Sequence, residues 1–338
     1  MIIIYLSKMA IFLRIYSFFS RIACRFKAAV RRMGIIKPRK APLPVISIGN
    51  LTLGGSEKTP LAMELLGFLQ NRGFRPALVT RGYKGKWENK GGVLSDGKTL
   101  YGGWEEAGDE PYMAARRYPG AGVFIGKRRY RSCLKAKESG FDVAVLDDGF
   151  QHIGLARGLD IVLHDLGTRQ VLREGFSSLK RADVLLLKKG GDERVSRNIR
   201  ARFPALSIFE YAVVSQGLRA LDTREFTAAE SLKGKTVLAF CGIARPERFF
   251  SLLEASGIRL GKRMIFPDHY TYPPSALANI ARICGSTKPG ALITTEKDAI
   301  KIAGRTGVWA PVPTYMLNIG LDLPPAFFEK ILEYLGHV

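Results

Sequence analysis

The segment Gly54-Gly55-Ser56-Glu57-Lys58-Thr59 stands between an apolar run, Val45–Gly49, and a helix-like run, Leu61–Leu66. A strand, a glycine-rich turn, a Lys-Thr pair and a helix in this order are typical of a phosphate-binding loop. In such a loop, backbone N–H groups at the helix N-terminus bind phosphate, the lysine adds a positive charge, and the hydroxyl binds Mg²⁺. Glu57 is the exception, because the usual pattern has glycine immediately before the lysine. The sequence therefore predicts a phosphate site made by five residues: Gly54, Gly55, Ser56, Lys58 and Thr59.

Positive charge is concentrated at the start of the chain. The 338 residues have a net charge of +22, and the first 40 contain ten Lys or Arg residues and no Asp or Glu. This charge favours an anionic partner, such as nucleic acid, a phospholipid surface or a phosphorylated substrate. A nucleic-acid-binding protein should carry its basic residues across the folded lobes, so we predict no nucleic-acid partner. The four cysteines lie far apart without a CxxC pair, which indicates a reduced cytosolic compartment and no cysteine metal site.

Residues 1–40 combine this charge with an apolar body. Lys8 interrupts the apolar run, so the segment has no clean membrane span, and the broken run argues against a signal peptide. Four arginines would fall within roughly 20° of one line on a helix: Arg14, Arg21, Arg25 and Arg32. We predict an amphipathic helix that lies on an anionic, cytoplasmic membrane surface. An ordinary packed amphipathic helix is the alternative.

After residue 40, short apolar runs alternate with helix-like segments, which predicts an α/β fold with parallel sheets. The expected strands are Val45–Ile48, Ala77–Thr80, Val123–Ile125, Val143–Leu146, Ile161–Leu163, Val184–Leu187, Thr236–Cys241, Arg263–Phe266, Ala291–Thr294 and Thr314–Asn318. The expected helices are Ala107–Arg117, Tyr130–Ser139, Pro246–Ser256, Pro274–Cys284 and Pro325–Leu335. We predict a phosphate-loop domain over 41–215 and a second, smaller α/β domain over 216–338, with a ligand cleft between them.

Two acidic motifs lie between the phosphate loop and the second domain. Asp147 and Asp148 follow a buried strand, a position where carboxylates of phosphate-loop proteins hold Mg²⁺, although Asp-Asp-Gly also suits a turn. Asp109 lies in Gly108-Asp109-Glu110-Pro111, which opens an expected helix. It suits a base for a substrate hydroxyl, and a simple helix cap is the alternative.

The second domain contributes charged residues at the ends of its strands. His269, in Phe266-Pro267-Asp268-His269, is expected on a loop that faces the cleft. The run Thr294–Asp298, which ends an expected strand, is typical of a solvated turn, and a functional role is the alternative. Arg81–Gly85 and Lys127–Arg129 would give the first domain a positive ligand edge, or would be ordinary surface charge.

Taken in order, these segments resemble the tetraacyldisaccharide 4'-kinase family of lipid A biosynthesis. The resemblance covers most of residues 40–300, and three of its motifs in this order are highly specific: DDGFQH, GDEP and FPDH. The matching strings are Ile48–Thr52 with Gly54-Gly55-Ser56, Arg81-Gly82-Tyr83, Gly108–Pro111, Asp147–His152, Leu172-Arg173-Glu174, Gly242–Phe249, Phe266–His269 and Thr295–Asp298.

The resemblance implies ATP-dependent phosphorylation of the 4'-hydroxyl of a tetraacyldisaccharide 1-phosphate at the cytoplasmic face of the inner membrane. The partners that it implies are this lipid A precursor and the anionic membrane surface. ATP and Mg²⁺ are the expected cofactors. An N-terminal membrane-associated helix, already proposed from the charge pattern, belongs to the same expectation.

The resemblance also implies roles for residues at the matching positions. Lys58 would contact the β- and γ-phosphates, and Asp109 would accept the proton of the hydroxyl with help from His269. A metal ion would be held by four residues: Thr59, Asp147, Asp148 and Glu174. Arg129 is expected near the phosphates. This assignment agrees with the chemistry of phosphoryl transfer, which depends on positioning and charge neutralisation.

Glu57 departs from the family as well as from the general loop. Glycine at this position allows an unusual backbone conformation, and glutamate adds negative charge beside a polyanion. We therefore expect weakened ATP affinity, with the Glu57 carboxylate turned outward. Two alternatives stay open: a membrane-surface ATPase that acts as a switch, and a degenerate, non-catalytic kinase relative.

Overall fold

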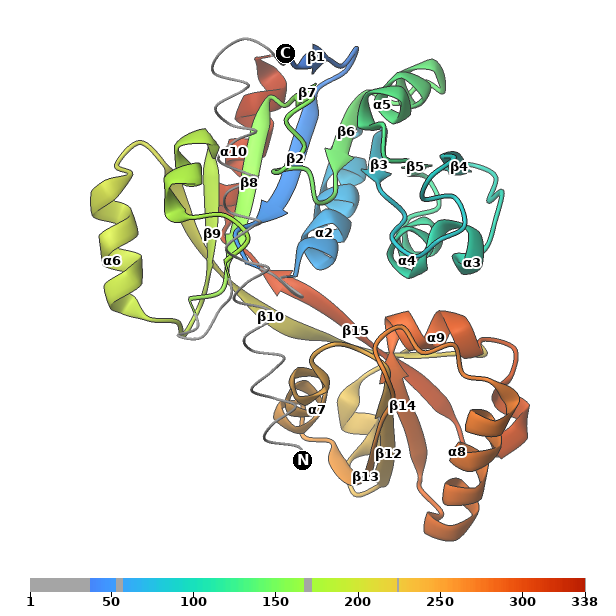
Figure 1. Ribbon diagram of the computed structural model, residues 1–338. Helices are drawn as coiled ribbons and strands as arrows, with labels where there is room; N and C mark the ends of the chain where they lie inside the picture. Colours follow the sequence, from blue (N-terminus) through green and yellow to red (C-terminus); the bar gives the residue numbers. More distant parts are fainter. Residues whose placement is uncertain (1–36, 53–56, 167–171, 224, 338) are drawn as a thin grey trace, which may run out of the picture.

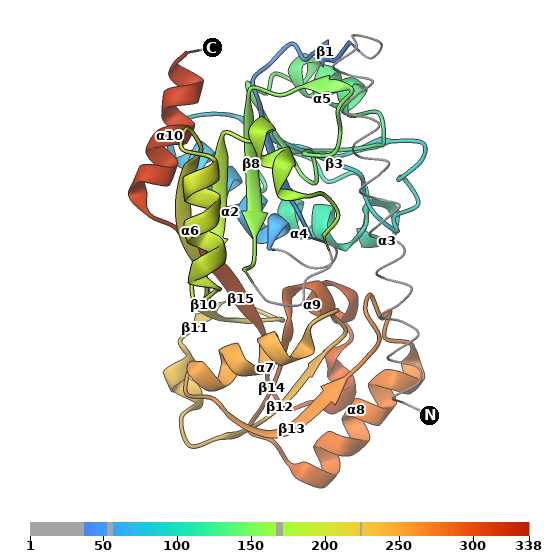
Figure 2. The ribbon, with the colours of Figure 1, turned by 60° about the vertical axis from the view of Figure 1, so that its left-hand side comes forward.

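The computed structural model describes residues 37–52, 57–166, 172–223 and 225–337 (Figure 1). Within this part of the chain, 13 strands form one sheet on which two lobes are built, and Figure 2 shows the same division from another side. Residues 1–36 of the predicted N-terminal helix lie outside the described residues, and Arg39–Lys40, at its predicted end, form a short strand instead. In the described ranges, no helix is long and apolar enough to cross a membrane.

The first lobe is a parallel sheet with β2 (Val45–Asn50) at its centre. Its neighbours on one side are β8 (Leu159–His164) and β9 (Val184–Lys188), and those on the other side are β6 (Val143–Leu146), β3 (Pro76–Thr80) and β5 (Gly122–Ile125). The apolar side chains of β2 are buried on both faces, as expected for a sheet covered by helices on each side. At the edge, β4 (Gly92–Asp96) pairs antiparallel with β5.

Five long helices cover the two faces of this sheet. On one face, apolar side chains pack from α2 (Lys58–Asn71), α4 (Asp109–Arg117) and α10 (Pro325–Gly336). On the other face lie α5 (Arg129–Glu138) and α6 (Glu193–Arg202). The short α3 (Trp104–Ala107) precedes α4. The C-terminal helix therefore belongs to the core of the first lobe, although its neighbours in sequence build the second.

The second lobe has its own three-layer arrangement. Its strands are β12 (Thr236–Cys241), β13 (Arg259–Ile265) and β14 (Ala291–Thr295), all parallel. Helix α7 (Pro246–Ala255) packs on one face and α8 (Pro274–Thr287) on the other. Helix α9 (Glu296–Ile302) follows β14 directly and faces α4 of the first lobe (Figure 1).

Two long strands join the lobes. The first part of β10 (Ser207–Ala220) pairs with β9, and its remainder pairs antiparallel with β15 (Thr314–Asp322), which also lies beside β14. The described residues also form short elements: β1 (Arg39–Lys40), β7 (Leu155–Ala156), β11 (Phe226–Thr227), η1 (Phe176–Arg181), η2 (Ala229–Leu232) and η3 (Thr306–Trp309).

The predicted α/β class and the positions of all ten expected strands are confirmed, with small shifts of their ends. The sheet is mostly parallel, as predicted, but it is mixed, because β4 and the β10–β15 pair are antiparallel. Strand β10 escaped prediction because most of its side chains are only half-buried, so it shows no clean apolar pattern. The division at residue 215 stays a prediction. That residue lies within β10, and α10 returns to the first lobe.

Candidate active site

Lys58 and Thr59 open helix α2, just beyond the end of β2. The Lys58 ammonium donates to Asn50 Oδ1 at 3.2 Å and lies 3.5 Å from Asp148 Oδ1. Side chains from the ends of β2 and β6 therefore meet at a helix N-terminus, whose backbone N–H groups favour a bound anion. Three predicted loop residues lie outside the described residues: Gly54, Gly55 and Ser56.

Asp147, which follows β6, has a buried carboxylate. Thr80 Oγ1 donates to its Oδ2 at 3.4 Å, whereas Oδ1 has no hydrogen-bond partner among the described residues. Burial, reinforced by the negative charges of Glu110 and Asp148, raises the pKa of Asp147 to about 6. A buried carboxylate oxygen without a donor is suited to a bound cation.

The pKa of the neighbouring Asp148 is shifted in the opposite direction. Arg173 Nη1 donates to both of its carboxylate oxygens, at 3.1 and 3.2 Å, and Lys58 lies on the same side. Burial favours the neutral acid, but the cations Lys58 and Arg173 outweigh it and lower the pKa of Asp148. The two adjacent carboxylates thus differ, because only Asp148 faces positive charge directly.

Arg129 and Glu174 were both predicted near the phosphates or the metal. Arg129, at the start of α5, is buried and donates to Gly126 O. Burial lowers the pKa of Arg129, and the negative charges of Asp147 and Asp148 offset part of this effect. The Glu174 carboxylate instead pairs with Arg181, and its neighbour Arg173 is the residue that contacts Asp148. The roles predicted for Arg129 and Glu174 stay predictions.

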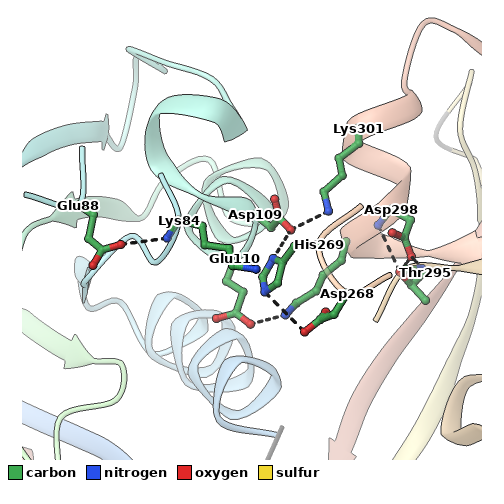
Figure 3. A network of polar contacts seen from close by, with 11 residues as sticks. Lys84, Glu88, Asp109, Glu110, Asp268, His269, Thr295, Asp298 and Lys301 are labelled. Carbon is green, nitrogen blue, oxygen red and sulfur yellow. Dashed lines mark hydrogen bonds and ion pairs between the residues drawn. The ribbon is translucent and has the colours of Figure 1, made fainter. Parts of the chain in front are cut away.

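Asp109 is held by two residues of the second lobe (Figure 3). His269 Nδ1 lies 3.0 Å from Asp109 Oδ2, and the Lys301 ammonium lies 2.8 Å from the same oxygen. Asp109 is 7% exposed, and the side chain of Lys301 is 1% exposed. Burial alone would raise the pKa of Asp109, but His269 and Lys301 outweigh it and lower that pKa below its ordinary value. The carboxylate is therefore kept ionised.

Asp109 and His269 are both positioned by residues with positive φ. Asp109 is the first residue of α4, after Gly108 at φ 92°, and a Cβ on this glycine would lie only 2.8 Å from Tyr83 O. His269 has φ 64°, and its N–H donates to Gly242 O at 3.1 Å. The structure thus brings His269 and Asp109 together across the two lobes, and the catalytic roles predicted for them stay predictions.

Asp298 is connected to the His269 loop by hydrogen bonds through Gly242. The Gly242 N–H donates to Asp298 Oδ2 at 2.9 Å, and Thr295 Oγ1 donates to the same oxygen at 2.6 Å. Since Gly242 O in turn accepts the N–H of His269, the buried Asp298 ties the start of α9 to that loop. The run Thr295–Asp298 is thus the start of a packed helix, not a solvated turn.

A second contact between the lobes lies one residue further along α4. Glu110 pairs with Lys297 of α9. Burial would raise the pKa of Glu110, but Lys297 and a hydrogen bond from the Thr59 side chain lower it. Glu110 therefore links α4 to α9 one residue beyond Asp109.

Lys301 is a residue that the sequence prediction missed, whereas Lys297 was named only as part of the charged run Thr295–Asp298. They are four positions apart on α9, so they lie on one helix face. This spacing was the available signal, but seven residues are too few for a clear helical pattern. In addition, a lysine is rarely buried, so sequence alone argued against Lys301.

The family model described as tetraacyldisaccharide-1-P 4'-kinase matches residues 9–336. The chain belongs to the tetraacyldisaccharide 4'-kinase family. This confirms the predicted family, the kinase activity and the place in lipid A biosynthesis.

Curated tetraacyldisaccharide 4'-kinases and a solved structure extend this result. The chain is 37% identical over 326 residues to the enzyme of Desulfotalea psychrophila, which covers 91% of this chain and 92% of the relative. It is 32% identical to that of Syntrophus aciditrophicus, with 97% and 92% covered. The crystal structure of LpxK from Aquifex aeolicus in complex with ATP matches with a TM-score of 0.76 and 30% identity, over 97% of this chain and 99% of that one.

Glu57 of this tetraacyldisaccharide 4'-kinase does not turn outward, so that expectation is wrong. Its side chain is only 9% exposed. Arg248 Nη1 donates to Glu57 Oε1, and Lys188 Nζ lies 3.6 Å from the same oxygen. The carboxylate is turned inward because two cations, one from each lobe, receive it there.

Proposed function

We propose that this chain transfers the γ-phosphate of ATP to the 4'-hydroxyl of a tetraacyldisaccharide 1-phosphate, with Asp109 as the general base. The observation that carries this proposal is the buried Asp109 carboxylate, held at Oδ2 by His269 at 3.0 Å and by Lys301 at 2.8 Å. An ionised carboxylate is the form that accepts a proton, and the hydrogen bond that His269 Nδ1 donates to Asp109 Oδ2 fixes the direction of the carboxylate. The family and the ATP complex of the Aquifex aeolicus relative support the substrate pair.

The phosphate chain of ATP would lie at the N-terminus of α2. Lys58 would contact the β- and γ-phosphates, and the loop residues Gly54, Gly55 and Ser56 would add backbone donors. Arg129, buried at the start of α5, would add positive charge near the transferred group. These residues position the reactants, which is most of what phosphoryl transfer requires.

Two oxygens suit a divalent cation, although the part of the chain that the structure describes holds no cluster of three or more His, Cys, Asp or Glu arranged as a metal site. Asp147 Oδ1 is buried without a donor among the described residues, and the Thr59 hydroxyl lies at the start of α2. These oxygens, with Asp148 and Glu174, are the hard ligands that Mg²⁺ prefers. Once bound, Mg²⁺ would neutralise negative charge on the phosphates. Glu174 would first have to leave Arg181, with which it pairs in the structure.

Transfer of label from radioactive ATP to a tetraacyldisaccharide 1-phosphate tests the proposed function. Label should enter the lipid when ATP, Mg²⁺ and acceptor are all present, and ATP should be consumed only with acceptor. Consumption of ATP that is stimulated by lipid vesicles alone, with no labelled acceptor, would instead establish the ATPase switch. A complete lack of turnover in a protein that binds ATP would indicate a degenerate kinase relative.

We also propose that residues 1–40 bind the anionic cytoplasmic face of the inner membrane, where the acceptor lipid lies. Their ten Lys or Arg residues and lack of Asp and Glu support this placement. Sedimentation with vesicles containing about 30% anionic lipid should pellet the full chain, and high salt should release part of it. Equal sedimentation with neutral and anionic vesicles would contradict an electrostatic contribution.

A further inference from the structure

Glu57 has an unusual backbone conformation for a glutamate. It precedes α2 with φ 53° and ψ 20°, the left-handed region in which glycine is favoured. A residue with a Cβ is disfavoured there and persists only when its surroundings hold it. Glu57 therefore keeps the backbone shape of the usual glycine, and its side chain must be accommodated by other residues.

Residues of both lobes contact the Glu57 carboxylate. Arg248, on the first turn of α7 in the second lobe, donates to Glu57 Oε1. From the first lobe, Lys188 lies 3.6 Å from that oxygen, and the Tyr211 hydroxyl donates to Oε2 at 3.4 Å. The carboxylate thus has partners on both oxygens, including two positive charges, immediately before Lys58.

Arg248 is itself anchored to the first lobe. Its Nη2 donates to Asp165 Oδ2 at 2.6 Å, just beyond the end of β8. Arg245, on the same end of α7, lies 3.5 Å from Asp165 but has no contact with Glu57 among those found in the described residues. The guanidinium of Arg248 is therefore held in place by a second carboxylate.

We propose that Arg248 is a positioning residue of the ATP site, which neutralises Glu57 and thereby allows a phosphate loop without its usual glycine to bind a triphosphate. The proposal rests on the proposed function, because ATP is the ligand. The physical reason is Coulombic: a buried carboxylate beside the phosphates repels them unless cations of the protein compensate it. Glu57 then need not weaken ATP binding, although its charge is unfavourable by itself.

A double-mutant cycle of Glu57 and Arg248 tests this inference, with Kd for Mg²⁺-ATP measured by titration calorimetry on the full chain. Arg248→Met should raise Kd about tenfold or more, because it leaves Glu57 undercompensated. In the Glu57→Gly background, the same substitution should change Kd by less than about twofold. Glu57→Gly alone should change Kd by less than about threefold, since the wild-type charge is already neutralised.

Two further variants separate charge from folding. Arg248→Lys keeps the positive charge and should retain most of the ATP affinity. Arg245→Met removes a cation from the same end of α7, where it contacts Asp165 rather than Glu57, and should leave Kd within about twofold of the wild type. Thermal melts of all variants identify any that fail to fold, and the Glu57→Gly/Arg248→Met protein then shows whether loss of Arg248 is tolerated without Glu57.

The results discriminate clearly. An Arg248→Met effect of equal size in both backgrounds would overturn the inference, because Arg248 would then act on ATP or on the fold without Glu57. No effect of Arg248→Met would overturn it as well. Failure of wild-type protein to phosphorylate the lipid would defeat the proposed function, whereas the binding cycle decides the role of Arg248 from Kd alone.

Discussion

Asp109→Asn should lower kcat for phosphate transfer by about 10²- to 10⁴-fold, with Kd for ATP unchanged. The amide has the shape of the carboxylate but cannot accept the proton of the acceptor hydroxyl. ATP binding should survive, because the contacts of Asp109 among the described residues are with His269 and Lys301 of the second lobe. Single-turnover transfer of labelled phosphate and titration calorimetry measure the two quantities separately.

Loss of the Asp109 charge also leaves Lys301 buried without its counter-ion, which is destabilising. The Asp109→Asn/Lys301→Met variant removes both charges and should regain thermal stability while it stays inactive. Recovery of transfer activity in that variant would show that Asp109 has only a structural role.

The Lys301→Met variant should change the pH dependence of kcat/KM, because Lys301 lowers the pKa of Asp109. In the wild type, the pKa of Asp109 is lowered, so the base is ionised at neutral pH and kcat/KM falls only under acidic conditions. Without the Lys301 ammonium that pKa rises, and the acidic fall of kcat/KM should move upward by about one pH unit. An unchanged pH profile would mean that Lys301 does not tune the base.

Lys58→Met should lower kcat by about 10²- to 10³-fold and also weaken ATP binding. The Lys58 ammonium lies at the N-terminus of α2, between Asn50 and Asp148, where it can meet the developing charge on the transferred phosphate. Methionine keeps the apolar stem of the side chain and removes only the charge.

Lys330→Met provides the control, because Lys330 pairs only with Glu333 on the exposed face of α10 among the described contacts. It removes the same charge far from the phosphate loop and should leave kcat and Kd unchanged. Equal losses in the two variants would show that overall charge, rather than the position of Lys58, determines activity.

The sheet was predictable to the extent that its strands bury apolar residues on both sides. Strands such as β2 and β12 are nearly continuous apolar runs. A strand that is covered on both faces needs apolar side chains at successive positions, so the run itself predicts the strand. Strand β10 was not predictable in this way, because it pairs with β9 along one part and with β15 along the other, with most side chains half-buried. The return of α10 to the first lobe also leaves no local signature, since its apolar face would suit either lobe.

In the site, local patterns were sufficient for residues whose role depends on one strand end or one helix start. Lys58, Asp148 and Asp109 are of this kind, because the turn after a strand or the first turn of a helix places them. Lys301 and Arg248 are different. Their partners Asp109 and Glu57 are distant in the sequence, and no local pattern encodes which opposite charge a long side chain will reach.

The phosphate loop contains both kinds of information. Its strand, turn, Lys-Thr pair and helix are encoded in consecutive residues, because hydrogen bonding and backbone sterics act over short stretches of chain. The effect of Glu57 was not encoded there. Its charge is balanced by Arg248, 191 positions away, and by Lys188. The effect of this charge on the phosphate site therefore depends on contacts that form only when the two lobes fold together.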